Sequence, residues 1–202
     1  MTNPIKYAGR GGRTTHPLIW LAAIFCTVLA IAVIITGIAI FIGYLAIRPR
    51  IPSLRVTYAR LERINYDQTG QFDARLTIMI AATNENAKAH VRFSDISFFI
   101  RFQRTPVAEL RSESFDVHKN SSVTLGYDVQ SSSIPLEPSA MEDMETSLSQ
   151  DKITFHLNGD ARTRFKIGAV SLLKFWIHLS CQLDFVISSG SSVGPSCSSK
   201  SR

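Results

Sequence analysis

The longest uncharged segment of the chain constrains its fold more than any other feature. Thirty consecutive residues, from Leu18 to Ile47, carry no charge and are mostly Ile, Leu, Val, Ala and Phe. A helix needs roughly 20 apolar residues to cross a ~30 Å hydrocarbon core, so this segment can span a bilayer with some tilt. Trp20 and Tyr44 lie near its two ends, as is typical of interfacial aromatic residues. The sequence therefore predicts a transmembrane helix at residues 18–47.

Two other interpretations of this segment are weaker. The apolar part of a secretory signal runs about 7–15 residues and precedes a small-residue cleavage site, whereas Ala30 and Ala32 lie inside the run. A buried core helix would not require aromatic residues at both ends. We therefore expect an uncleaved anchor in a lipid bilayer. Ala39 and Gly43 are four residues apart, a spacing that permits close helix approach and leaves a homo-oligomer through this helix open.

The net charge of +6 is concentrated outside the body of the chain. Residues 61–199 hold 13 Lys and Arg against 16 Asp and Glu, and no basic stripe alternates with stacking aromatic residues. Nucleic-acid binding is therefore not expected. The arginines that flank the apolar segment suit anionic lipid headgroups, although they equally serve to fix the depth of a helix.

Composition divides the chain into five segments. We expect a disordered basic tail at 1–17, the transmembrane helix at 18–47 and a proline-containing juxtamembrane link at 48–53, because Pro49 and Pro52 favour an extended exit. One folded domain is expected at 54–187. Residues 188–202 are rich in Ser and Gly, which predicts a mobile tail.

The expected domain is mainly β. Between Lys174 and Phe185, apolar and polar residues alternate with period two, which is typical of a half-buried strand. Similar patterns predict strands at 54–64, 72–83, around 98–102, and at 107–117, 121–129 and 152–167. Pro138 and the spacing of Met141, Met144 and Leu148 predict one short helix at 137–150. About seven strands without a strand–helix rhythm favour an antiparallel, immunoglobulin- or fibronectin-III-like β-sandwich.

No residues of this chain form a convincing catalytic or metal-binding pattern. Residues 190–194 match Gly-x-Ser-x-Gly, yet no Asp, Glu or His follows Ser192, so the nucleophile would lack its triad partners. None of the five histidines makes a helical i, i+3 or i, i+4 metal-ligand pair, and no phosphate-binding or dinucleotide motif is present. We expect no enzyme activity, no metal and no cofactor.

Two features beyond the apolar segment bear on its orientation. Asn120-Ser121-Ser122 is a glycosylation sequon, expected in an exposed hairpin turn. Cys181 and Cys197 are the only cysteines beyond the segment; they are either a bridged pair or free thiols, with Cys181 then a small buried residue. The count of basic residues on the two sides does not decide the orientation. We expect a cytosolic N-terminus and an extracellular C-terminal domain.

The order of these features resembles a plant family. A basic N-terminus, one apolar span, a proline-containing exit and Asn84-Glu85-Asn86 after an early strand are similar to the harpin-induced and non-race-specific-disease-resistance-like proteins with a group-two late-embryogenesis-abundant domain. Residues 159–168 resemble the family's Gly-x-x-Arg-x-Lys-x-Gly stretch, and Cys181 resembles its cysteine on the next strand. Glu85 stands where the family has proline in its turn motif, and the usual closing strand is not expected after Cys197.

The resemblance implies residence in the plasma membrane and a part in plant defence or stress responses. It also implies an outside domain and no known catalytic mechanism. The leading hypothesis is that the β-sandwich binds an unidentified protein or cell-wall partner. The alternative is a membrane-anchored protectant against desiccation that has no specific partner. Protectants that act unfolded are very hydrophilic, whereas apolar residues recur here at strand periodicity.

Overall fold

A computed structural model describes residues 17–47, 50–67, 69–167 and 170–201, and the expected basic tail falls largely outside them. The chain divides into two compact units, residues 1–48 and 49–202. The first unit contains α1 (Pro17–Ile47), a 31-residue helix long and apolar enough to cross a membrane. The large apolar side chains along it are exposed, as expected for a helix whose solvent is lipid.

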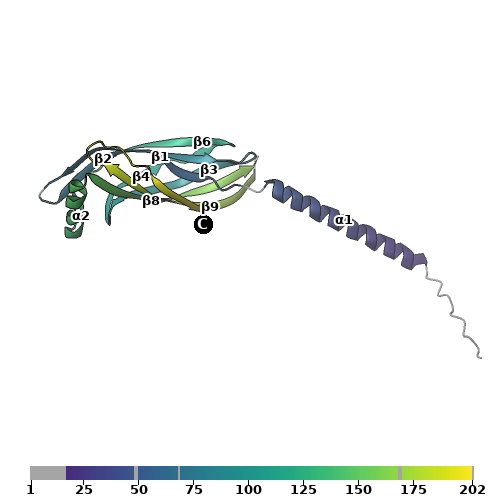
Figure 1. Cartoon of the computed structure of the whole chain (residues 1–202). Coiled ribbons are helices and arrows are strands. Elements are labelled where there is room, and N and C mark those ends of the chain that lie inside the picture. The colour runs from purple at the N-terminus through teal and green to yellow at the C-terminus, as the bar shows by residue number, and fades with distance from the viewer. Residues whose placement is uncertain (1–16, 48–49, 68, 168–169, 202) are drawn as a thin grey trace, which may run out of the picture. The chain divides into compact units, whose positions relative to one another are not determined.

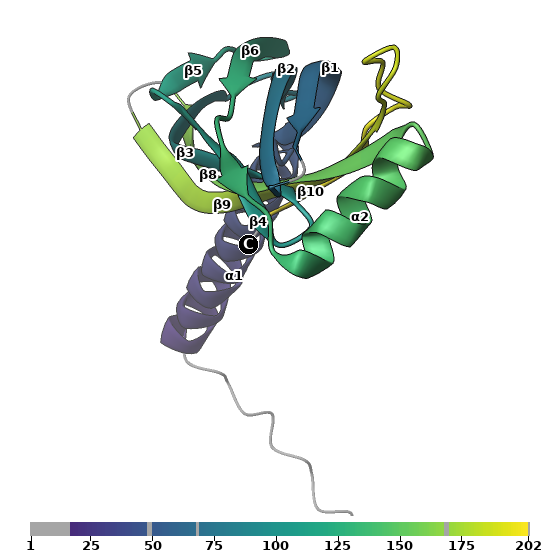
Figure 2. The same ribbon diagram turned by 90° about the vertical axis from the view of Figure 1, so that its left-hand side faces the viewer.

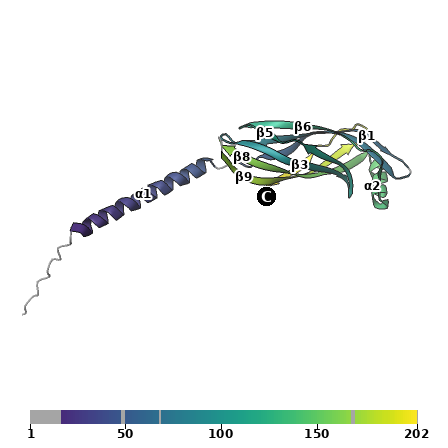
Figure 3. The ribbon, with the colours of Figure 1, turned by 180° about the vertical axis from the view of Figure 1, so that it is seen from behind.

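The second unit is a two-layered antiparallel β-sandwich with a short helix, which confirms the predicted fold class. In the described residues its first sheet has the order β1 (Ser53–Tyr66), β2 (Gln71–Asn84) and β6 (Ser121–Gln130), with β7 (Ile134–Pro135) paired to β2. The second sheet has the order β10 (Ser196–Ser201), β9 (Val170–Val186), β8 (Lys152–Ile167), β3 (His90–Phe102) and β4 (Thr105–Ser112), with β5 (Phe115–Val117) paired to β3. Figures 1 and 3 show β6 in one layer and β8 and β9 in the other.

Alternating side chains build the core between the two sheets. In β2, Leu76, Ile78 and Ile80 are fully buried while the residues between them point outward. Six phenylalanines are among the largest fully buried side chains: Phe72, Phe93, Phe98, Phe102, Phe155 and Phe185. The ring centroids of Phe155 and Phe185 are 6.0 Å apart in an edge-to-face arrangement, which is a favourable aromatic geometry.

Helix α2 (Pro138–Ser149) covers one end of the sandwich (Figure 1). Pro138 starts it in agreement with its preference for the first helical turn, and Ala140 and Met144 are its buried residues. The turn before β2 lies against this helix. Gly70 has φ +78°, and a Cβ there would lie 2.0 Å from Cε of Met141. We call this the α2 end of the domain.

The prediction of a mobile tail at 188–202 is wrong for its last part, and the predicted domain boundary at 187 is too short. Ser196–Ser201 form β10 on the edge of β9, with Lys200 opposite His178. The preceding loop is held by main-chain bonds, since the Leu61 N–H donates to Gly190 O at 3.0 Å and the Val186 N–H donates to Ser191 O at 2.9 Å. Figure 2 shows this loop in yellow beside β1. A closing strand, not expected from the sequence, is thus present.

Candidate functional site at the Asn84–Asn86 loop

The predicted turn motif, Asn84-Glu85-Asn86, connects β2 to β3, and its two asparagines are buried. Asn84 is fully inaccessible and Asn86 is 6% exposed, whereas Glu85 is exposed. Buried amides are costly unless each polar atom has a partner. The loop therefore has to be judged by its hydrogen bonds rather than by turn propensity alone.

Asn84 holds two other segments through one side chain. Its Nδ2 donates to the carbonyl of Ala89 at 2.9 Å, of His118 at 3.1 Å and of Val117 at 3.3 Å. Its Oδ1 accepts from the main-chain N–H of Asn86 at 3.1 Å and from Nδ2 of Asn86 at 2.8 Å. Asn84 thus ties the end of β2 to the start of β3 and to the end of β5.

Asn86 binds the segment that enters the domain. Its Oδ1 accepts from the main-chain N–H of Arg50 at 2.6 Å, and its Nδ2 donates to the Arg50 carbonyl at 2.6 Å. This pair of bonds imitates a β-ladder contact with an amide side chain. The loop thus fixes the chain at Arg50, where it enters the second unit.

The sequon residue Asn120 lies at the same place. It is exposed, has φ +48°, and its N–H donates to the carbonyl of Asn86 at 3.1 Å. The expected hairpin turn is wrong, because β5 pairs with β3 in one sheet and β6 pairs with β2 in the other. The turn at Asn120 instead carries the chain from one layer to the other.

These segments surround an open polar hollow, which we call the Arg50 end of the domain. It is lined by Arg50, Thr83, Asn84, Glu85, Asn120, Ser121 and Ser122. Arg50 and Glu85 approach to 3.5 Å, with both side chains largely exposed, so this ion pair contributes little to stability. The amides and main-chain groups here hold the chain together, and their hydrogen-bonding capacity is largely used within the protein.

A second open hollow lies on the outer face of the β1–β2–β6 sheet. The guanidinium of Arg75 donates to both carboxylate oxygens of Asp128, at 2.8 and 3.3 Å, and this pairing lowers the pKa of Asp128. Nδ2 of Asn65 donates to Asp73 Oδ2 at 3.3 Å. Arg75 and Asp128 are thus paired across neighbouring strands, and Glu62, Arg63 and Asp73 also line this hollow.

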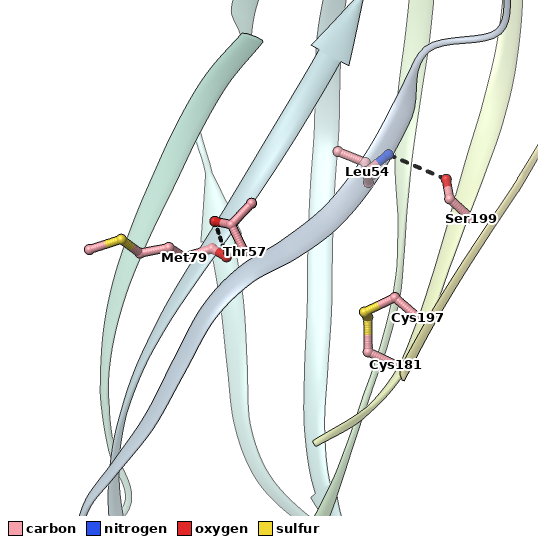
Figure 4. Close-up of a disulfide and its surroundings, with 6 residues drawn as sticks. All are labelled: Leu54, Thr57, Met79, Cys181, Cys197 and Ser199. Carbon is pink, nitrogen blue, oxygen red and sulfur yellow. Dashed lines mark hydrogen bonds between the residues drawn. A yellow bond between two sulfur atoms is a disulfide. The ribbon is translucent and has the colours of Figure 1, made fainter. Parts of the chain in front are cut away.

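The two candidate cysteines form a disulfide that joins β9 to β10 (Figure 4). They are directly opposite in the register, with Cα atoms 4.1 Å apart. Cys181 is buried on the core side, and Ser199 beyond Cys197 accepts a 3.3 Å hydrogen bond from the main-chain N–H of Leu54. The bridge and this bond hold the final strand against the rest of the sandwich.

The family-like stretch after Gly159 has a structural basis at its first residue. A Cβ at Gly159 would lie 2.2 Å from the carbonyl oxygen of Ser97 and 2.5 Å from the Cα of Phe98. β3 has a register shift between Ser94 and Ser97 at this point, a bulge that brings its main chain close to β8. Gly168, the other end of the stretch, lies outside the described residues.

The Gly-x-Ser-x-Gly match, Gly190 to Gly194, is a surface loop and has no strand–turn–helix context. Gly190 has φ +66°, and a Cβ there would lie 2.1 Å from the Leu61 carbonyl oxygen, so glycine is required for the close approach to β1. Oγ of Ser191 lies 2.7 Å from Oγ of Ser189. Within residues 17–201 where described, His, Cys, Asp and Glu form no group of three that would bind a metal.

Sequence reasoning identified the asparagine loop but not its role. It treated Asn84 and Asn86 as turn formers, while the structure uses them as buried connectors to Arg50 and to the β5–β6 link. The sequence did carry one signal, because two asparagines follow an apolar strand directly. A buried amide must satisfy its donors and acceptors, so buried asparagines at this position indicate hydrogen bonds to other segments. Their partners Val117, His118 and Arg50 lie 33–36 residues away in sequence, and no local pattern reveals them.

Comparison with known proteins tests the family resemblance that the sequence features indicate. No family model matches the chain. NDR1/HIN1-like protein 12 of Arabidopsis thaliana is 23% identical over 164 residues, which cover 80% of this chain and 77% of that protein. NDR1/HIN1-like protein 3 of the same plant is 25% identical over 176 residues, which cover 86% and 76%. The chain is a homologue of the NDR1/HIN1-like proteins.

The predicted family resemblance is thereby confirmed, while the group-two late-embryogenesis-abundant domain stays a prediction. Among solved structures, a protein from Archaeoglobus fulgidus aligns with 65% of this chain and 97% of that chain, at 13% identity and a TM-score of 0.33. This similarity is too low to support an inference about either fold or function. The NDR1/HIN1-like relatives are the comparison that informs the function.

Proposed function

We propose that this NDR1/HIN1-like chain is a single-pass plasma-membrane protein whose β-sandwich is a non-enzymatic interaction module in plant defence or stress responses. One observation carries the proposal: a 31-residue helix without charge precedes, through a short proline-containing link, a separate unit with its own buried core. Homology with the NDR1/HIN1-like proteins supports the defence or stress setting. The proposal includes a domain of the group-two late-embryogenesis-abundant type.

The proposed orientation places the sandwich outside the cell. The Cys181–Cys197 disulfide supports this, because such bonds persist in oxidising compartments and are rare in the cytosol. The exposed sequon at Asn120 is accessible to glycosylation on the same side of the membrane. Both features belong to one unit of the chain, and an extracellular location accounts for both.

The interaction module is favoured over the desiccation protectant by the packing of the sandwich. Its phenylalanine-rich core is buried between two sheets, while a protectant that acts unfolded requires little apolar material. The proposal assigns no reaction to the chain, and the polar groups at the Arg50 end act within the fold, chiefly as hydrogen-bond partners of main-chain groups. The partner is a protein or a cell-wall component.

Protease accessibility tests the orientation. The full chain is expressed in plant cells with different epitope tags at its two ends, and protease is added to intact cells. We expect loss of the C-terminal tag and survival of the N-terminal one. Complete protection of the C-terminal tag, with digestion after the membrane is permeabilised, would reverse the orientation. Glycosylation and the disulfide would then no longer be expected.

Proximity labelling tests the interaction module. A labelling enzyme is attached to the C-terminal side of the full chain and of a control that retains only residues 1–49. We expect neighbours labelled by the full chain alone. Identical sets of neighbours would contradict the module, and a broad, non-cooperative thermal transition of the full chain would favour the protectant instead.

A further inference from the structure

We propose that the outer face of the β10–β9–β8–β3–β4 sheet, near the Arg50 end, is a docking surface for acidic lipid headgroups. The surface, called the basic face below, consists of Arg92, Arg162, Arg164, Lys166, Lys174 and Trp176. The inference rests on the proposed membrane anchoring, and it requires acidic lipid in the leaflet on the domain's own side. The probe for it is phosphatidylserine.

The sheet register places these residues side by side on three strands. Arg92 of β3 is opposite Arg164 of β8, and Arg164 is opposite Lys174 of β9. Alternation along the strands turns them outward, because Phe93 and Phe165 next to them are buried in the core. Like charges directly opposite each other destabilise a sheet, so the row is unfavourable for the fold alone.

Carboxylates neutralise only part of the basic face. Arg162 pairs with Asp95 at 2.9 Å and Arg92 with Asp116 at 3.5 Å. Among the described residues, no ion pair involves Arg164, Lys166 or Lys174. Three cationic side chains on adjacent strands are thus available to an external anion, and lysine and arginine both bind phosphate groups readily.

Trp176 gives this face an interfacial residue. Its side chain is among the exposed large hydrophobic ones, at 39%, and the Arg162 guanidinium carbon lies 4.7 Å from its ring centroid. Amphipathic aromatic rings favour the headgroup region of a bilayer. A face that combines cations with tryptophan fits an acidic membrane surface better than it fits a purely polar ligand.

Charge is separated along the length of the domain. Residues 164–174 contain three basic residues and no acid, while residues 137–151 around α2 contain five acids and no base. Strand β8 begins at Lys152 directly after α2 and extends to Ile167, so Lys152 and Arg164 are about 40 Å apart at ~3.3 Å per residue. An acidic surface therefore attracts one end of the domain and repels the other.

The basic face lies at the end of the domain that is tethered. Asn86 holds Arg50, β3 starts four residues later at His90, and His90 is opposite Lys166. Three peptide units from Ile47 to Arg50 span at most about 11 Å, close to the ~8 Å Debye length at physiological ionic strength. A link of this length allows the Arg50 end to approach the surface of the membrane that α1 spans.

Fluorescence of Trp176 measures the docking directly. The chain has two tryptophans, so the full chain with Trp20→Phe, produced in bacteria without glycans, reports on Trp176 alone. It is placed in nanodiscs of phosphatidylcholine, with or without phosphatidylserine, that carry a fixed fraction of a lipid with a nitroxide on its headgroup. We expect at least about twofold stronger quenching with phosphatidylserine, reversed at high salt because the attraction is screened.

Two charge-reversal variants separate the basic face from overall charge. Arg164→Glu with Lys174→Glu should abolish the dependence on phosphatidylserine. Arg101→Glu with Arg104→Glu, which changes the charge equally near the α2 end, should retain it. If the first variant does not fold, Arg164→Gln with Lys174→Gln should reduce the dependence while keeping the thermal transition.

The outcomes distinguish this inference from the proposed function. Equal quenching in both kinds of nanodisc, or equal loss in both reversal variants, overturns the lipid-docking surface. A change in Trp176 emission on addition of polygalacturonate, without dependence on phosphatidylserine, would also overturn it and indicate an acidic polysaccharide. Failure of the chain to insert into nanodiscs at all would instead contradict the membrane anchor.

Discussion

The side-chain amide of Asn86 and the main chain of Arg50 form two reciprocal hydrogen bonds of 2.6 Å each. The Asn86 amide thereby makes the hydrogen bonds that a neighbouring strand would make to Arg50, which precedes β1. Because Arg50 follows α1 by three residues, this pairing determines where the chain enters the sandwich. The Asn84–Asn86 motif is thus a structural clasp rather than a surface turn.

Loss of this clasp should destabilise the domain. Asn86→Ala leaves the main-chain N–H and carbonyl of Arg50 without their partners and removes one of the two hydrogen bonds to Oδ1 of Asn84, so we expect a loss of about 2 kcal/mol or more. Thermal unfolding of the full chain in detergent micelles measures the effect. Glu85→Ala is the matched control, because its exposed ion pair should contribute little. Equal effects of the two substitutions would contradict the assigned role.

Gly159 should tolerate no side chain. Gly159→Ala places a methyl group 2.2 Å from the Ser97 carbonyl oxygen, so we expect a loss of about 1–3 kcal/mol from overpacking. Gly126→Ala, also within a strand but with no atom within 4 Å of the added Cβ, should be neutral or slightly stabilising. Chemical denaturation of both variants with the wild type tests this. Similar midpoints for the two would argue against the close approach at the β3 bulge.

The disulfide should hold β10 in place. Cys181→Ser with Cys197→Ser removes a crosslink that closes a loop of separation 16, which corresponds to about 3 kcal/mol on the chain-entropy model. We expect faster trypsin cleavage at Lys200 in this variant, detected by mass spectrometry. Thiol labelling of unreduced wild-type protein should modify Cys26 alone. Labelling of three cysteines would show that the bridge is absent.

Acid should weaken the contact between β8 and β9 at Asp184. The Thr154 hydroxyl donates to its carboxylate at 2.6 Å, and this bond lowers the pKa of Asp184. A lowered pKa contributes stability that is present above the unfolded value of about 4 and is lost as the pH falls through the folded value. The stability difference between wild type and Asp184→Asn should therefore shrink below about pH 4. A difference in unfolding free energy between the two proteins that stays constant from pH 6 to pH 3 would contradict this role of Asp184.

Asn120 should carry a glycan if the domain is extracellular. Expression in plant cells should give a band whose shift disappears with glycosidase and with Asn120→Gln. Ser122→Ala is the better matched variant, because it removes the sequon while retaining the asparagine that suits the positive φ at 120. A shift that persists in both variants would indicate another modification, since the chain contains no second sequon.

The sequence by itself determined the membrane helix and the strands with internal alternation. Residues 18–47 contain no charged side chain, so the whole segment can lie in lipid. In strands such as β9, apolar and polar residues alternate and thereby indicate which face is buried. Both patterns arise from burial, which acts on each residue according to its own side chain. The sandwich class followed from the number and spacing of such segments.

Tertiary structure alone decided the features that depend on distant partners. Residues 196–201 lack apolar alternation, so their strand exists because the edge of β9 offers unpaired main-chain groups and Cys181 lies opposite Cys197. Asn84 and Asn86 found partners more than 30 residues away, and Arg92, Arg164 and Lys174 became neighbours through register. Hydrogen bonds and charge clusters depend on which atoms the folded chain brings together, and local periodicity in the sequence does not predict those contacts.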